Sequence, residues 1–82
     1  MKTVKELGAY CSENNMALTY MKQGDGHLVL IEVWDKNGDK FYSKTKGNVL
    51  CQAITTALID IKRIRTSLKK QNLLCKESIQ EK

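Results

Sequence analysis

The sequence predicts an α+β fold in the order α-β-β-β-α, with a three-stranded antiparallel sheet packed by an N-terminal helix and a long C-terminal helix. Three observations support this prediction. A capping motif opens the chain, two runs with strand patterns follow between glycine-containing turns, and a long apolar seam at helical spacing comes last. With 82 residues the chain makes one domain, which we place at 1–70, and 71–82 form a short terminal helix or a frayed tail.

The first helix and the first two strands follow from local patterns. Thr3 and Glu6 form a T-x-x-E capping box, which predicts a helix over 3–14. Residues 16–21 alternate between apolar and polar side chains, and the turn residues QGDG come next, so we expect a strand there. The run HLVLIEVW, residues 27–34, is rich in β-branched and apolar residues and predicts the central strand.

The central strand is apolar on both of its faces. If the helices cover only one face of the sheet, the other face exposes one of two alternating sets, either Leu28, Leu30 and Trp34 or Val29, Ile31 and Val33. The sequence leaves both sets open. An exposed apolar sheet face is typical of an interface, and a second copy of the chain is one alternative for covering it.

A hairpin turn leads into the third strand. Asn37-Gly38 is the residue pair that a two-residue type I′ turn prefers, because both residues accept a positive φ. We therefore expect a returning strand at 41–44. A two-residue loop would place Trp34 opposite Phe41.

The long helix is predicted over 49–70, where apolar residues recur at spacings of four and three and Asn48 offers an N-cap. At about 1.5 Å per residue this helix is about 33 Å long, whereas a six-residue strand is about 20 Å long. Its second half is therefore expected to extend beyond the sheet, pack on the first helix or meet another molecule. Trp34, Ile64 and Leu68 are the residues we expect at such an interface.

The net charge of +5 is concentrated near the end of the chain. Residues 1–60 contain seven Lys and seven acidic residues, whereas residues 61–82 contain seven cations and two acidic residues. The candidate binding residues are the cations of the long helix and the two lysines just before it: Lys62, Arg63, Arg65, Lys69, Lys70, Lys44 and Lys46. A basic segment on a neutral body predicts an acidic partner, either nucleic acid or protein.

Three interpretations of the basic segment stay open. Its cations solvate the outer side of an ordinary helix, or they surround an apolar seam that meets a partner or a second copy, or they hold phosphates. Thr66 is the only polar uncharged side chain on the cationic arc, so we do not expect specific base readout. Five cations in contact with phosphates would give a salt slope of about −4.

The sequence shows no constellation of catalytic or metal-binding residues. The single histidine, His27, has no sequence partner for catalysis, and no His or Cys pair has zinc spacing. The run DKNGDK is similar to the start of a calcium-binding loop. The sixth and twelfth positions of such a loop would be Lys40 and Lys46, where calcium loops have Gly and Glu. We therefore expect a protein that is not an enzyme and that needs neither cofactor nor metal.

The cellular location is expected to be cytoplasmic. Three cysteines are an odd number without a C-x-x-C pair, which does not suit a disulfide scaffold. The start lacks the apolar core of a signal peptide, and no apolar run approaches the roughly 18 residues of a membrane span.

Two stretches of the chain are similar to known domains. HLVLIEVW with Trp34, followed by VLCQAITTAL with Cys51, Ala53 and Ala57, resembles the small phage proteins called the phage ABA-sandwich domain. The resemblance implies an αβββα accessory protein of a phage or mobile element, a group that includes anti-CRISPR and other anti-defence inhibitors. Such a protein would bind and inhibit or modulate a host protein in the host cytoplasm, without enzymatic activity.

The second resemblance concerns the long helix. AITTAL, residues 53–58, is similar to the last helix of the double-stranded RNA-binding domain, which has the same order of elements. The lysine positions of that family fall on Gly47, Asn48 and Cys51 here. This resemblance implies the alternative function, a nucleic-acid-binding module that uses the basic C-terminal helix.

Overall fold

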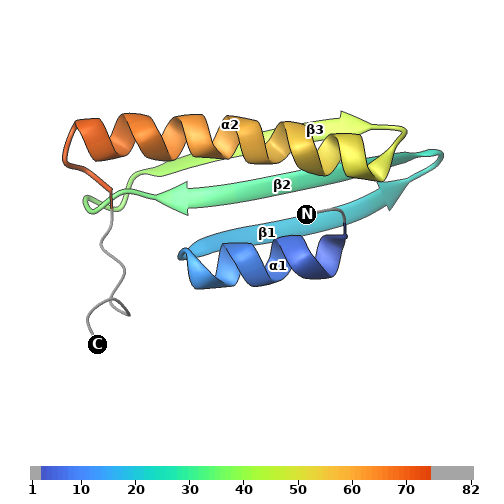
Figure 1. Ribbon diagram of the computed structural model, residues 1–82, viewed down its shortest axis with the longest axis horizontal. Helices are drawn as coiled ribbons and strands as arrows, with labels where there is room; N and C mark the ends of the chain where they lie inside the picture. Colours follow the sequence, from blue (N-terminus) through green and yellow to red (C-terminus); the bar gives the residue numbers. More distant parts are fainter. Residues whose placement is uncertain (1–2, 75–82) are drawn as a thin grey trace.

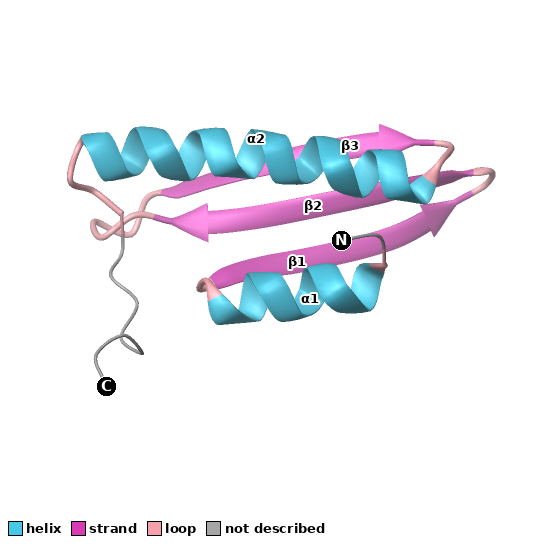
Figure 2. Ribbon diagram, viewed as in Figure 1, coloured by secondary structure: helices cyan, strands magenta, loops and turns pink. Residues whose placement is uncertain are grey.

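The computed structural model describes residues 3–74 and confirms the predicted fold class (Figure 1). The elements are α1 (Val4–Glu13), β1 (Met16–Gln23), β2 (Gly26–Trp34), β3 (Lys40–Gly47) and α2 (Leu50–Lys70). The three strands form an antiparallel sheet with β2 in the centre, and both helices lie on one face of it (Figure 2). The terminal segment predicted at 71–82 lies outside the described residues from residue 75 onward.

The first helix begins at the predicted capping box. The Thr3 hydroxyl oxygen accepts a hydrogen bond from the Glu6 backbone N–H at 3.1 Å, and the Glu6 carboxylate accepts one from the Thr3 backbone N–H at 3.2 Å. Asn15, with a φ of 57°, then turns the chain into β1 in the left-handed conformation that Asn tolerates better than most residues. α1 therefore packs back over the strand that follows it.

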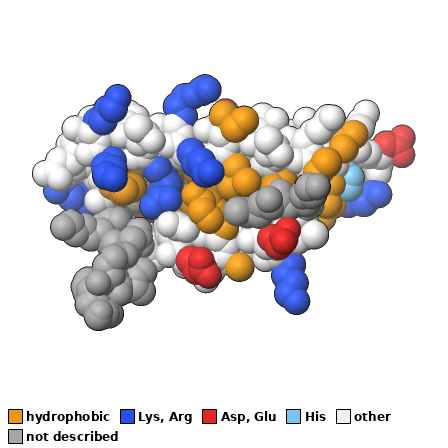
Figure 3. Space-filling model, in the orientation of Figure 1, with side chains coloured by type: hydrophobic (Ala, Val, Ile, Leu, Met, Phe, Trp, Pro, Cys, Tyr) orange, Lys and Arg blue, Asp and Glu red, His pale blue; other side chains and the backbone are white. Residues whose placement is uncertain are grey.

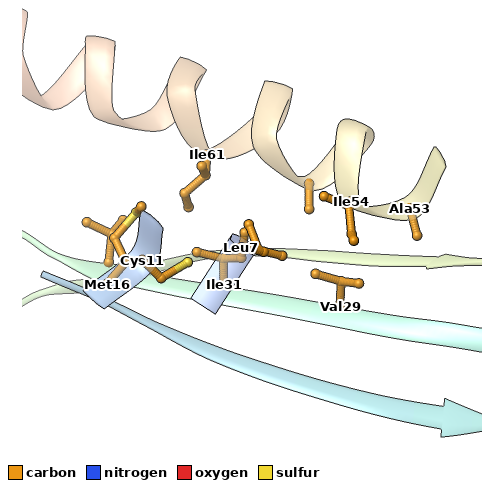
Figure 4. Packing of buried hydrophobic residues seen from close by; sticks show 10 residues of the cluster. Leu7, Cys11, Met16, Val29, Ile31, Ala53, Ile54 and Ile61 are labelled. Carbon is orange, nitrogen blue, oxygen red and sulfur yellow. The ribbon is translucent and has the colours of Figure 1, made fainter. Parts of the chain in front are cut away.

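The core lies between the helices and one face of the sheet (Figure 4). Leu7 of α1 and Ile54 and Ile61 of α2 point toward Val29 and Ile31 of β2, and all five side chains are fully buried. Full burial of an aliphatic side chain of this size stabilises the fold by about 1.5–3 kcal/mol. The two helices and the central strand thus share a single core.

The β2–β3 hairpin differs from the predicted two-residue turn. Asp35 and Asp39 pair through a backbone hydrogen bond of 2.9 Å, which leaves a three-residue loop, and Gly38 takes a φ of 88° at its end. The Asp35 carboxylate accepts hydrogen bonds from the backbone N–H groups of Asn37 and Asp39 at 2.8 and 2.9 Å, which stabilise the wider loop. Asn37 does not take the positive φ that a type I′ turn requires.

This loop shifts the strand pairing by one residue from the prediction. Trp34 lies opposite Lys40 rather than Phe41, which pairs with Val33. A shift of one residue exchanges the two faces of a strand. The predicted pairing would have placed Lys44 opposite buried Ile31, under the helices, whereas the observed pairing places buried Ser43 there. The observed register therefore keeps lysines out of the core.

The long helix also corrects two expectations. Its N-cap is Val49, with no side-chain hydrogen bond, because the helix begins one residue later than an Asn48 cap would allow. Its second half extends beyond the sheet less than expected, because only the C-terminal end of α2 passes the end of β2 (Figure 1). The 21 residues of α2 measure about 31 Å, and the nine residues of β2 measure about 30 Å, so the strand is as long as the helix above it.

Candidate functional site

One face of the sheet carries no helix and exposes apolar side chains. Because alternate residues of β2 are buried under the helices, Leu28, Leu30 and Trp34 point to the opposite side. The structure therefore selects one of the two sets that the sequence left open. Trp34, which we expect at an interface, lies on this side and is exposed.

Neighbouring strands widen this apolar surface. Met21 of β1 lies opposite Leu28, and Tyr42 of β3 lies opposite Glu32, two residue pairs away from Trp34. Trp34 is 38% exposed and Tyr42 is 57% exposed, which is high for aromatic side chains. Leu28 and Leu30 are half-buried by their strand neighbours. We call these five residues, Met21, Leu28, Leu30, Trp34 and Tyr42, the open face.

Charge is distributed unevenly around the open face. Lys40, Lys44 and Lys46 of β3 lie on the same side of the sheet, and the Lys40 Nζ lies 3.0 Å from a carboxylate oxygen of Glu32. The residues of β1 that face this side are uncharged: Ala17, Thr19, Met21 and Gln23. The surface is therefore apolar along β2, cationic along β3 and neutral along β1.

A second candidate surface lies on α2, on the other side of the molecule. Four of the predicted cations are exposed there, and Arg65 is half-buried. Figure 3 shows Lys and Arg gathered over the C-terminal half of this helix. Two shallow pockets lie on it, and Lys62 and Thr66 line both of them. We call the set Lys62, Arg63, Thr66, Lys69 and Lys70 the α2 outer face.

The structure does not bring all the predicted binding residues together. Lys44 and Lys46 lie on the uncovered side of the sheet. The cations of α2 lie on the outer side of that helix, which covers the opposite side of the sheet. Leu68 is only 3% exposed and Ile64 packs against the core, so the apolar seam of α2 is not available to a partner. The reason is that the strands run under most of the helix, and the segment that follows it is held to the β2–β3 loop by a hydrogen bond from the Lys36 backbone N–H to the Leu73 carbonyl.

Several open-face residues were missed in the sequence. The predicted hairpin register, which was wrong by one residue, placed Tyr42 on the side of the sheet opposite to Trp34. Met21 was predicted only as a member of the first strand. The signal that finds them is the alternation of β1 and β3 once their register with β2 is fixed.

The single histidine and the described cysteines lie outside these two surfaces. The Tyr20 hydroxyl and His27 Nδ1 are hydrogen-bonded at 2.6 Å, and their rings stack. Burial raises the pKa of the Cys11 thiol, whereas Cys51 is exposed. Residues 3–74 contain no group of three or more His, Cys, Asp or Glu side chains placed to hold a metal ion.

Searches with protein-family models, among curated proteins and among solved structures find no match. Within the described residues, neither helix combines the length and apolar character needed to cross a membrane.

Proposed function

We propose that this chain is a non-enzymatic binding protein that docks through the open face on a host protein and inhibits or modulates it. The observation that carries the proposal is the exposed pair Trp34 and Tyr42, beside the leucines of the central strand. Trp and Tyr are the side chains most enriched at the energetic centres of protein interfaces. Burial of this apolar strip under a partner would remove it from water, which favours association.

The charges around the open face define the partner. Three lysines and one glutamate leave the surface cationic, and the cations lie along β3 only. A partner with an apolar centre and carboxylates along one side complements this pattern. A second copy complements it less well, because each copy has a net charge of +5.

Nucleic acid suits the open face less well than protein does. The centre of the face is formed by Leu28 and Leu30, which offer no ring for a base to stack on. The Glu32 carboxylate lies opposite Tyr42 and two residues along β2 from Trp34, so it places a negative charge beside both rings, where it would repel a phosphate backbone. These features favour a protein partner.

The biological setting of the proposal depends on the resemblance to small phage proteins. That resemblance supports the proposal that the partner is a host protein, with host defence systems as the first group to test, met in the host cytoplasm. The open face supplies the contact surface, and the resemblance supplies the kind of target.

Affinity capture from a nuclease-treated host lysate tests the proposal. The tagged chain, a Leu30→Glu variant and an Ile59→Glu variant are compared at the same concentration. Both substitutions place a carboxylate at an aliphatic position, but Ile59 is exposed on α2, away from the open face. We expect a specific host protein with the unmodified chain and with Ile59→Glu, and at least tenfold less of it with Leu30→Glu.

Circular dichroism of each variant ensures that a loss of capture reflects the surface and not unfolding. If Leu30→Glu captures the same protein as well as the unmodified chain does, the open face is not the docking site. If the unmodified chain captures no protein above a tag-only control, the proposed function fails.

A further inference from the structure

The α2 outer face is a separate surface that the proposed docking on the open face does not use. From residue 62 to residue 70, every exposed side chain is a cation or carries a hydroxyl group. Lys62 and Lys69 form one row, Arg63 and Lys70 form another, and Thr66 lies between the rows. Residues seven positions apart lie on the same side of a helix, about 10.5 Å apart along its axis.

These cations are not neutralised by the described part of the chain. Lys62, Arg63, Lys69 and Lys70 form no ion pair within residues 3–74. Asp60, the only acidic residue of α2, instead accepts a hydrogen bond from the Ser43 hydroxyl of β3 at 3.3 Å. The two rows gather four like charges on one side of the helix, where they repel one another, so a bound polyanion would relieve this repulsion.

The composition of the α2 outer face indicates whether its polyanionic partner is an acidic protein or a nucleic acid. The centre of a protein–protein interface is depleted of charge and enriched in apolar and aromatic side chains. Interfaces with nucleic acid are more polar and much more positively charged. No exposed apolar side chain lies between residues 62 and 70, because Ile64 and Leu68 face the core side of the helix.

We infer that the α2 outer face binds the phosphate backbone of a nucleic acid without sequence preference. Lysine and arginine supply the charge, and the hydroxyl groups of Thr66 and Ser67, which line the shallow pocket beside Lys62, supply neutral donors to phosphate oxygens. Asn and Gln, the side chains that read adenine edges, are absent from this segment, so the contact positions the backbone and does not select bases. The chain then has a protein-binding surface and a nucleic-acid-binding surface on opposite sides.

Fluorescence anisotropy with a labelled 20-base-pair random-sequence DNA duplex, and with the equivalent RNA duplex, tests the inference. The triple variant Lys62→Glu, Arg63→Glu and Lys70→Glu is compared with a matched control, Lys5→Glu, Lys22→Glu and Lys36→Glu, whose positions belong to neither surface. All six positions are exposed, and both variants change the net charge by the same amount. Circular dichroism and thermal unfolding establish that both remain folded.

We expect the unmodified chain to bind duplex at 50 mM salt with a salt slope of about −4, whereas the α2 variant, which keeps only Lys69 of the four cations, binds at least tenfold more weakly with a slope near −1. The control is expected to stay within threefold of the unmodified chain. Equal losses in the two variants, or no binding at 50 mM salt, would overturn the inference. A polyglutamate peptide that binds as tightly as duplex would also overturn it and assign the surface to an acidic protein.

The open-face variant Leu30→Glu separates this inference from the proposed function. Because the α2 outer face is independent of the open face, Leu30→Glu is expected to keep duplex binding within threefold while it loses the host protein. If Leu30→Glu also loses duplex binding while remaining folded, the two surfaces are not separate and the assignment to α2 fails.

Discussion

At the scale of single residues, burial decides which side chains hold the fold and which are free to meet another molecule. Ile54 and Ile59 lie five positions apart on α2, yet Ile54 is fully buried and Ile59 is 53% exposed. Five positions rotate a helix by about 140°, which carries a side chain from the core to solvent. Cys11 and Cys51 form a similar contrast, since the first is buried and the second is exposed.

Ile54→Ala and Ile59→Ala make the same chemical change in these two environments. We expect Ile54→Ala to lower the free energy of unfolding by about 3 kcal/mol, because it removes buried surface and leaves a cavity. Ile59→Ala is expected to change it by less than about 0.5 kcal/mol. Urea denaturation of both variants checks the difference, and similar values would contradict the assigned core.

The burial of the Cys11 thiol makes the free energy of unfolding depend on pH in a direction that can be predicted. Because burial raises the pKa of Cys11 in the folded chain, its stabilising contribution is complete below the unfolded-state pKa and is lost as pH rises through the folded-state pKa. The difference in unfolding free energy between the unmodified chain and Cys11→Ala should therefore shrink above a pH of about 9. Urea titrations of the two proteins at neutral and alkaline pH measure it, and a constant difference would contradict the burial of this thiol.

At the scale of elements, the sequence predicted every helix and strand but not the pairing of β2 with β3. Capping residues, alternation and helical spacing are local signals, so they identified α1, β2 and α2 correctly. The hairpin register depends on the length of the loop, which can have two or three residues. Asn37-Gly38 is compatible with both lengths, and the hydrogen bonds to the Asp35 carboxylate stabilise the three-residue loop. Strand length was likewise underestimated, which made α2 seem too long for the sheet.

Two glycine substitutions distinguish helix geometry from loop geometry. Gly8→Ala in α1 is expected to raise the free energy of unfolding by about 0.5–1 kcal/mol, because Ala favours the helix and its methyl group would make an ordinary 3.8 Å contact with Leu18. Gly38→Ala should lower it by about 1 kcal/mol or more, because Gly38 holds a φ of 88°. Thermal unfolding measures both, and a stabilising Gly38→Ala would contradict the three-residue loop.

At the scale of the whole molecule, the arrangement of layers explains why the candidate surfaces could only partly be predicted. The basic segment was visible in the sequence, but its separation from Lys44 and Lys46 required the position of the sheet between them. The sequence did not determine which of the two alternating apolar sets of β2 is exposed. The choice between them was made by the packing of both helices on the same face, which is a tertiary event without a local signal.

The central claim is that this chain leaves the open face uncovered and that a different protein occupies it. Light scattering of the purified chain, at concentrations up to about 200 µM, tests this claim most directly because μM affinity between two copies would be visible there. The account predicts the mass of one chain, 9.3 kDa, at every concentration. A species of about twice that mass that Leu30→Glu converts to a single chain would contradict it, because the open face would then be the contact between two copies.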